Sequence, residues 1–134
     1  MNGQRAVRLS LVILWVGLQA TWAADVSQVL GTWEGQSLCT VPSSPCHNEH
    51  VVYHIRKAAG DDLVIGAYKI VDAREEFMGD IRCRYQPDRL SCSFRTPEED
   101  DWEFLISGKH MDGTLVIGKE KTLYRKVSVD KKSD

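Results

Sequence analysis

The sequence lacks the local motifs on which most enzyme classes depend. It contains no nucleophile elbow, no HExxH pair and no glycine-rich phosphate loop. Serine, histidine and aspartate all occur, but no spacing places three of them together as a catalytic triad. We therefore expect a protein that is not an enzyme and that uses no cofactor.

The chain also lacks a strong net charge and a second long hydrophobic run. Its net charge of −2 is too weak to indicate nucleic acid or an anionic membrane as a partner. The one long apolar run, "LSLVILWVGL", follows Arg5 and Arg8 and has about half of the ~20 residues that a membrane helix needs. Small residues follow, up to Ala23. This pattern predicts a signal peptide over 1–23, no membrane span, and a secreted or periplasmic domain over 24–134.

Cysteine is scarce, with four residues in the chain. In an exported domain of this size, four cysteines predict two disulfides, and three connectivities are open. Apolar and polar residues alternate on both sides of Pro87-Asp88, which predicts a β-hairpin with one buried face. Counting outward from this turn places Cys83 opposite Cys92, within reach of a disulfide. The second bridge is then Cys39–Cys46.

Histidine is rare too, but three of the four histidines lie in "PCHNEHVVYH", residues 45–54. Alternation and β-branched residues in "VVYHI" predict a strand, so His50 and His54 lie ~13 Å apart. One ion, bound at ~2.0–2.1 Å, cannot reach both. His47 and His50 could converge with Glu49 across the preceding turn, but we favour a solvent-exposed strand face and expect no metal site.

Alternation with period two continues through most of the chain and predicts almost no helix. The segment "LVIGAYKIV", 63–71, is apolar on both faces, so the pattern predicts a strand there but does not orient it. The eight expected strands are Gly31–Val41, Val51–Arg56, Leu63–Val71, 81–86, 89–95, a strand from Trp102, Thr114–Gly118 and Thr122–Val129. Short antiparallel strands without helical crossovers predict an all-β, up-and-down, eight-stranded barrel, with a β-sandwich as the alternative.

Two connections are predicted from local sequence. The segment 72–80, "DAREEFMGD", is expected to be the longest loop, lying over one mouth of the barrel. Asp112-Gly113 is the strongest hairpin signal. Counting across this turn places Trp102, Phe104 and His110 on the core-facing side.

A resemblance to a known fold appears at the two ends of the predicted barrel. The segment "VSQVLGTWEG" resembles the start of lipocalins and of the wider calycin group, in which a short helical turn leads into a Gly-x-Trp motif. The resemblance implies that Trp33 packs at the closed end of the barrel under a basic residue of the last strand. Arg125 in "TLYRKVSV" is the candidate, because alternation points it inward. An inward arginine needs an aromatic face or a carboxylate beside it.

Two functions fit this description. The first is binding of a small apolar ligand, and the expected binding residues are Tyr53, Tyr85, Phe94, Trp102 and Phe104 inside the barrel, Phe77 and Met78 at its portal, and His110 near a strand end. The alternative is a compact barrel with a filled core that acts as a protein-interaction or enzyme-inhibitor module through its loops. Eight strands enclose space only for side chains or one small ligand, so the sequence leaves both open.

Overall fold

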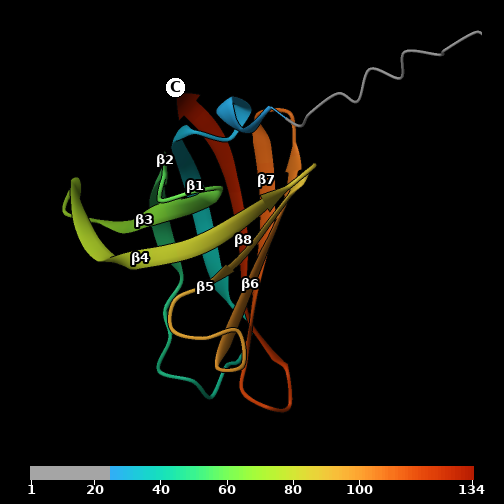
Figure 1. Ribbon diagram of the computed structural model, residues 1–134. Helices are drawn as coiled ribbons and strands as arrows, with labels where there is room; N and C mark the ends of the chain where they lie inside the picture. Colours follow the sequence, from blue (N-terminus) through green and yellow to red (C-terminus); the bar gives the residue numbers. More distant parts are fainter. Residues whose placement is uncertain (1–24) are drawn as a thin grey trace, which may run out of the picture.

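The computed structural model describes residues 25–134, which form a closed barrel of eight antiparallel strands in up-and-down order (Figure 1). One 3₁₀ turn, η1 (Val26–Gln28), precedes the barrel. The strands are β1 (Gly31–Cys39), β2 (Glu49–Lys57), β3 (Asp62–Val71), β4 (Arg74–Gln86), β5 (Arg89–Ser93), β6 (Asp100–Ser107), β7 (His110–Ile117) and β8 (Thr122–Ser133). The predicted barrel is confirmed and the sandwich alternative is wrong. The predicted signal peptide lies outside the described residues.

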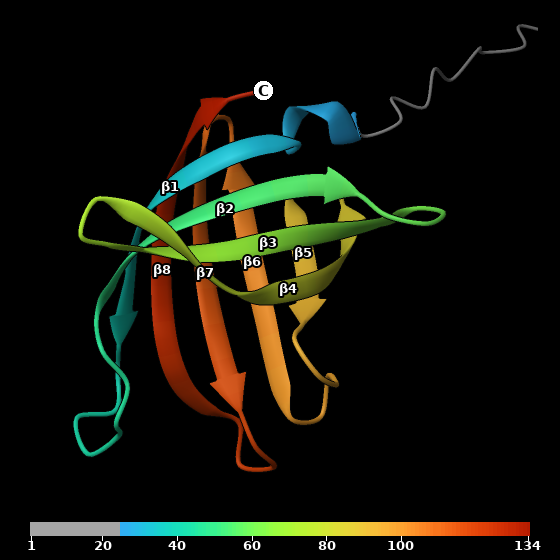
Figure 2. The same cartoon turned by 90° about the vertical axis from the view of Figure 1, so that its left-hand side faces the viewer.

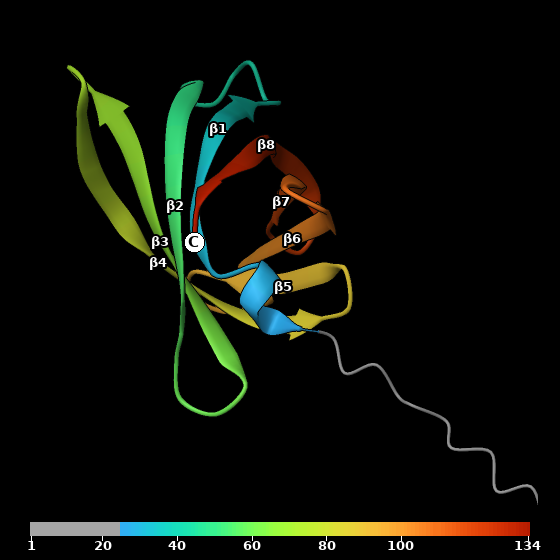
Figure 3. The same cartoon turned by 90° about the horizontal axis from the view of Figure 1, so that it is seen from above.

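The barrel has two different ends because successive strands run in opposite directions. We call the end that carries η1 and the C-terminus the closed end, and Figure 3 views the barrel from that side. We call the other end the open end. The β1–β2, β5–β6 and β7–β8 connections lie there, below the strands in Figure 2. In the same view, β1 to β4 run across β5 to β8, so the two halves of the sheet wrap around the core.

Side chains fill the closed half of the barrel. Trp33 is completely buried, and its indole Nε1 donates a hydrogen bond to the Val29 carbonyl at 2.9 Å. The other large side chains with almost no exposure are Tyr53, Phe104, Leu63, Ile65, Leu90, Met111, Val51 and Val129. Burial alternates along β5, β7 and the second half of β4, as the sequence pattern predicted. In β2 and β3, three consecutive residues are buried, 51–53 and 65–67.

The basic residue beside Trp33 is Lys131, not Arg125. Lys131 pairs with Trp33 in the β1–β8 register, and its Nζ donates to the Gln28 carbonyl at 3.0 Å. Arg125 pairs with Cys39 near the open end. The predicted Trp33–Arg125 contact is therefore wrong, because β8 runs from the open end to the closed end and its early residues cannot reach Trp33.

Both predicted disulfides are present. Cys83 and Cys92 are partners in the β4–β5 pair, as the count from Pro87-Asp88 predicted. Their bridge lies in the buried core of the barrel. Cys39 and Cys46 are also bonded, and they close the β1–β2 loop at the open end.

The segment 72–80 is not a loop. It belongs to a long β3–β4 hairpin whose two-residue turn is Asp72-Ala73, and this hairpin projects beyond the barrel wall (Figure 1). Both turn residues have positive φ, 49° and 61°, which matches the primed turns that suit twisted hairpins. The sequence prediction failed here because neither turn residue is glycine.

Asp112-Gly113 is not a turn either. The β6–β7 turn is Gly108-Lys109, and Ser107 pairs with His110. Gly108 takes the positive φ of 60° that this turn needs. Gly113 instead pairs with Phe104 inside the barrel, where an added Cβ would lie 2.6 Å from the ring, so this glycine provides space rather than a bend. In this register His110 faces outward, so its predicted inward orientation is wrong.

Candidate functional site

A cavity of about 240 Å³ occupies the open half of the barrel. Every strand of the first half of the chain contributes to its wall, together with the β5–β6 connection, β6 and β8. The lining residues are Ser37, Glu49, Val51, Tyr53, Ala67, Met78, Gly79, Ile81, Phe94, Trp102 and Arg125. Most of this wall is apolar, and the few polar groups come from β1, β2 and β8.

A β-bulge shapes the rim of this cavity. Ala67 pairs with Gly79, whereas the next residue of β3, Tyr68, pairs with Phe77, so Met78 is the extra residue on β4. Because the bulge interrupts the alternation, Met78 lines the cavity while Phe77 points to the outer surface, 57% exposed. Phe94 lies against Gly79, at a position where a Cβ would collide with its ring.

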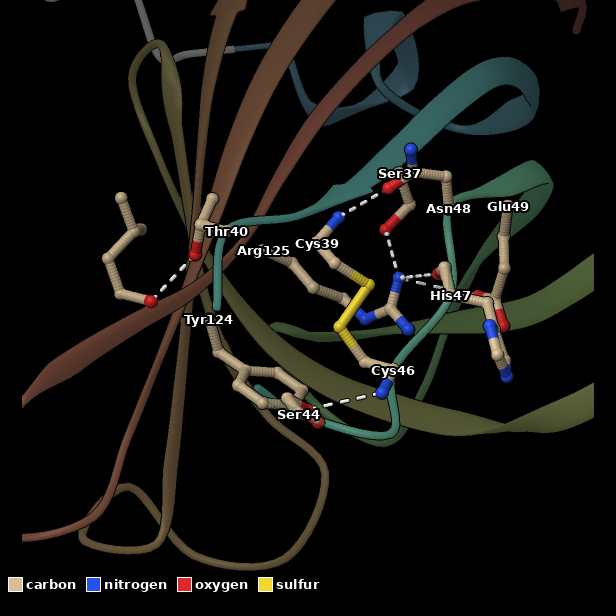
Figure 4. Close-up of a disulfide and its surroundings, with 11 residues drawn as sticks. Ser37, Cys39, Thr40, Ser44, Cys46, His47, Asn48, Glu49, Tyr124 and Arg125 are labelled. Carbon is tan, nitrogen blue, oxygen red and sulfur yellow. Dashed lines mark hydrogen bonds and ion pairs between the residues drawn. A yellow bond between two sulfur atoms is a disulfide. The ribbon is translucent and has the colours of Figure 1, made fainter. Parts of the chain in front are cut away.

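The polar part of the wall is centred on Arg125 (Figure 4). Its Nη1 donates to Ser37 Oγ at 3.1 Å and to the His47 carbonyl at 3.0 Å. The carboxylate of Glu49 lies 3.6 Å from the same nitrogen. The Arg125 side chain is only 13% exposed, so a positive charge stands inside the wall of a largely apolar cavity.

The β1–β2 loop keeps these acceptors in place. The Cys39–Cys46 disulfide ties the loop to the end of β1 (Figure 4), and the Asn48 side chain accepts a hydrogen bond from the Cys39 amide at 2.8 Å. Ser44 and Tyr124 hydrogen-bond through their hydroxyl groups, which connects the loop to β8. The His47 carbonyl is thereby held against Arg125.

Tyr53 brings a second polar group to the cavity. The residue is 1% exposed, and in the described part of the chain its hydroxyl has no hydrogen-bond partner. Among residues 25–134, no fully buried side-chain nitrogen or oxygen lacks a partner, so this hydroxyl must open onto the cavity that Tyr53 lines. Burial raises the pKa of Tyr53 well above its usual range, with Arg125 acting to lower it and Glu49 to raise it. The hydroxyl therefore stays protonated and can donate a hydrogen bond.

The structure brings together half of the residues predicted to bind a ligand. Tyr53, Met78, Phe94 and Trp102 line the cavity. Phe104 lies beneath them in the core, stacked on Trp102 with ring centroids 5.9 Å apart.

The other three predicted binding residues lie elsewhere. Tyr85 is at the closed end, near Val26 and Lys57. Phe77 packs against Tyr68 on the outer surface, and His110 is on the outside of β7. None of the three touches the cavity at the open end.

Sequence reasoning missed Ser37 and Glu49 and placed Arg125 at the wrong end. One signal was available, since alternation pointed Arg125 inward and required a carboxylate or an aromatic partner. Glu49 is that carboxylate. Glu49 lies beside Arg125 because of the geometry of the β1–β2 loop, and no local pattern in the sequence reveals this geometry.

The histidines form separate pairs with carboxylates on the outer surface. His50 Nε2 lies 2.6 Å from Glu34, and His54 Nε2 lies 2.9 Å from Glu75. The backbone carbonyl of His47 contacts Arg125. In residues 25–134, no group of three or more His, Cys, Asp or Glu side chains is arranged to hold a metal ion.

His110 lies between two carboxylates. Its Nδ1 is 2.8 Å from Asp130, and its Nε2 is 3.0 Å from Asp112. The hydrogen bond to Asp130, followed by the one to Asp112, raises the pKa of His110 above its usual value. Because the two carboxylates approach opposite edges of the ring, they stabilise its protonated form and cannot share one ion with it.

Comparison of the sequence with models of known protein families and with curated protein sequences found no match. The fold itself fits a calycin-like barrel, with eight antiparallel strands in sequential order. Among residues 25–134, no helix has the length and hydrophobicity required to cross a membrane.

Proposed function

We propose that this protein is an exported, lipocalin-like binding protein that takes up one small, largely apolar molecule through the open end of its barrel. The observation that carries the proposal is the cavity of about 240 Å³ above the buried Tyr53. At the ~30 Å³ that one water occupies in the liquid, this space holds on the order of eight to ten non-hydrogen atoms. The ligand is thus smaller than the drug-sized molecules that fill pockets of ~300–1,000 Å³.

The disulfides support the exported location. Two bridges, Cys39–Cys46 and Cys83–Cys92, are typical of proteins from oxidising compartments. The predicted signal peptide over 1–23 accounts for export to the periplasm or the medium. Cleavage there leaves Trp33 and Trp102 as the two tryptophans of the domain, and only Trp102 lines the cavity.

A series of linear alcohols from butanol to decanol tests the proposal, with Trp102 fluorescence as the readout. Each added methylene that enters the cavity contributes ~0.8 kcal/mol, so we expect affinity to rise about fourfold per carbon. The gain should stop when the chain fills the cavity. Saturable binding with this length limit is the expected result.

Two substitutions on β3 provide the control. Ala67 faces the cavity, whereas Val64 lies on the outer face of the same strand. Ala67→Leu should occupy the space and weaken octanol binding, and Val64→Leu should leave it unchanged. An absence of saturable binding in the unsubstituted protein, or an equal effect of both substitutions, would contradict the proposal.

A second candidate function is protein interaction through the β3–β4 hairpin. The hairpin extends beyond the barrel (Figure 1) and exposes Val71 at 40% and Phe77 at 57%. Phe77 packs against Tyr68 on the outer face of the hairpin, and apolar groups gathered on one face of a projecting element can contact a partner. If this is the function, the alcohols will not bind saturably, and Phe77→Ser will abolish capture of the natural partner while leaving the thermal stability of the barrel unchanged.

A further inference from the structure

We propose that the natural ligand is a small carboxylic acid, bound as its anion, whose carboxylate is held by Arg125 and by the Tyr53 hydroxyl. The inference rests on the proposed function, because it assigns a chemical class to the occupant of the same cavity. Its apolar body would lie against the remaining wall, which includes Val51, Ala67 and Ile81.

The first support is the set of donors that Arg125 leaves unused. Both hydrogen bonds that it makes to the described part of the chain come from Nη1, to Ser37 and His47. The Nη2 and Nε groups have no such partner, although Arg125 lines the cavity. A guanidinium presents its N–H groups as a planar fork that matches a carboxylate, so the unused edge is suited to an anionic oxygen pair.

The second support is Tyr53, whose hydroxyl opens onto the same cavity and has no hydrogen-bond partner in the described residues. A ligand that fills the cavity removes this hydroxyl from water, and leaving it without a hydrogen bond is then costly, so a ligand oxygen beside it is favoured. Arg125 and Tyr53 come from β8 and β2 and line the same cavity of about 240 Å³. This cavity is small enough for one ligand head group to approach both donors.

Glu49 forms an ion pair with Arg125 on the Nη1 side of the guanidinium and leaves Nη2 and Nε without a partner in the described residues. Its carboxylate lies 3.6 Å from Nη1, beyond hydrogen-bond distance, whereas the two bonds of Nη1 go to neutral oxygens. The Glu49 side chain is 21% exposed and keeps contact with water. Because Glu49 also lines the cavity, its charge repels a bound carboxylate, and the carboxylate therefore has to take the Nη2–Nε edge, away from the Nη1 side on which Glu49 lies.

Octanoate and octanamide are the probes for this inference, since they have the same shape and differ in charge. Binding to the full domain is measured by calorimetry at neutral pH. We expect octanoate to bind about 10- to 100-fold more tightly than octanamide, as charge-assisted hydrogen bonds predict. In Arg125→Gln this preference should fall to near one, with octanamide affinity retained as proof that the cavity is intact. Tyr53→Phe should reduce the preference less.

Lys131→Gln is the matched control, because Lys131 is also a half-buried base of β8 but lies at the closed end. It should keep the full preference for octanoate. Equal affinities of the two probes in the unsubstituted protein, or a preference that survives Arg125→Gln, would overturn the carboxylate assignment and leave the apolar binding function standing. A lack of saturable binding by both probes would overturn the proposed function and this inference together.

Discussion

Arg125 and Lys131 face the interior of the barrel from the same strand, six positions apart, and their surroundings give them different roles. Lys131 donates to the Gln28 carbonyl of the turn that covers the closed end. Arg125 donates to Ser37 and to the His47 carbonyl at the open end. The base at the closed end thus holds the turn that covers the barrel, whereas the one that lines the cavity keeps N–H donors that have no partner in the described residues.

Lys131→Met should therefore lower stability without affecting ligand binding. Its Nζ makes a charge-assisted hydrogen bond to a backbone carbonyl, and bonds of this kind contribute ~1.5–3 kcal/mol. We expect a loss of ~1–3 kcal/mol in urea unfolding followed by Trp33 fluorescence. Lys132→Met, at the exposed neighbouring position, should cost much less. Equal stability of the two variants would show that Lys131 does not hold the closed end.

His110 should make stability depend on pH in a defined direction. Its folded-state pKa is raised above ~6.5 by the hydrogen bond to Asp130 and then by the one to Asp112. Protonated His110 therefore contributes to the free energy of unfolding. The contribution is fully present below the pKa of the unfolded state and is lost as the pH rises through the higher pKa of the folded state. NMR titration should find the pKa of His110 above ~6.5, and Asp130→Asn should lower it. A pKa that is unchanged in Asp130→Asn would contradict this account.

At the scale of elements, the β3–β4 hairpin shows how a turn can form without its preferred residues. Asp72 and Ala73 both adopt positive φ, a conformation that disfavours any residue with a Cβ. The long pairing of β3 with β4, from Asp62 to Val71, compensates for this strain. The turn is thus determined by the strands on either side of it.

Ala73→Gly should stabilise the protein. Glycine adopts the φ of 61° found at Ala73 without steric cost, and Asp-Gly is a preferred sequence for primed hairpin turns. We expect a gain of ~0.5–1 kcal/mol in chemical unfolding. Ala58→Gly, at a position without positive φ, should instead lower stability slightly. A loss of stability in Ala73→Gly would show that this turn is not strained.

The β-bulge at Met78 explains why the rim of the cavity was only partly predictable. The sequence pattern singled out the Phe77-Met78 pair as a portal. Strict alternation over this segment would place Phe77 on the same side as Gly79 and Ile81, inside the barrel. The extra residue of the bulge shifts the alternation by one position, so that Met78 lines the cavity and Phe77 faces outward. A bulge depends on pairing with β3, which local sequence does not specify.

In the molecule as a whole, alternation predicted the buried face of most strands, and with it the barrel and the Cys83–Cys92 bridge. It could not orient the strand Leu63–Val71, which is apolar on both faces. Alternation did not predict how far each residue lies from either end of the barrel. The inward orientation of Arg125 was predicted correctly, but the residue was assigned to the wrong end of the barrel. Its position along the barrel depends on the β1–β8 register, which places Lys131 opposite Trp33. That pairing joins the two ends of the chain, and no turn between them fixes it.

The candidate site depends on the same long-range geometry. Ser37, Glu49 and Tyr53 lie within two early strands, yet they line one cavity with Arg125 only because the barrel closes between β1 and β8. The hydrophobic pattern could identify Tyr53 and Trp102 as interior residues. It could not show that the closed half is filled and the open half is hollow, since this difference depends on how side chains of eight strands pack together.

A crystal of the protein soaked with 6-bromohexan-1-ol would show whether the cavity takes up a small apolar molecule, because bromine can be located by anomalous scattering and the alcohol carries no charge. We expect one strong bromine peak inside the open half of the barrel, among Tyr53, Ala67 and Trp102. A barrel with no bromine in this cavity, or with its only internal peak at the closed end beside Tyr85, would contradict the proposed function.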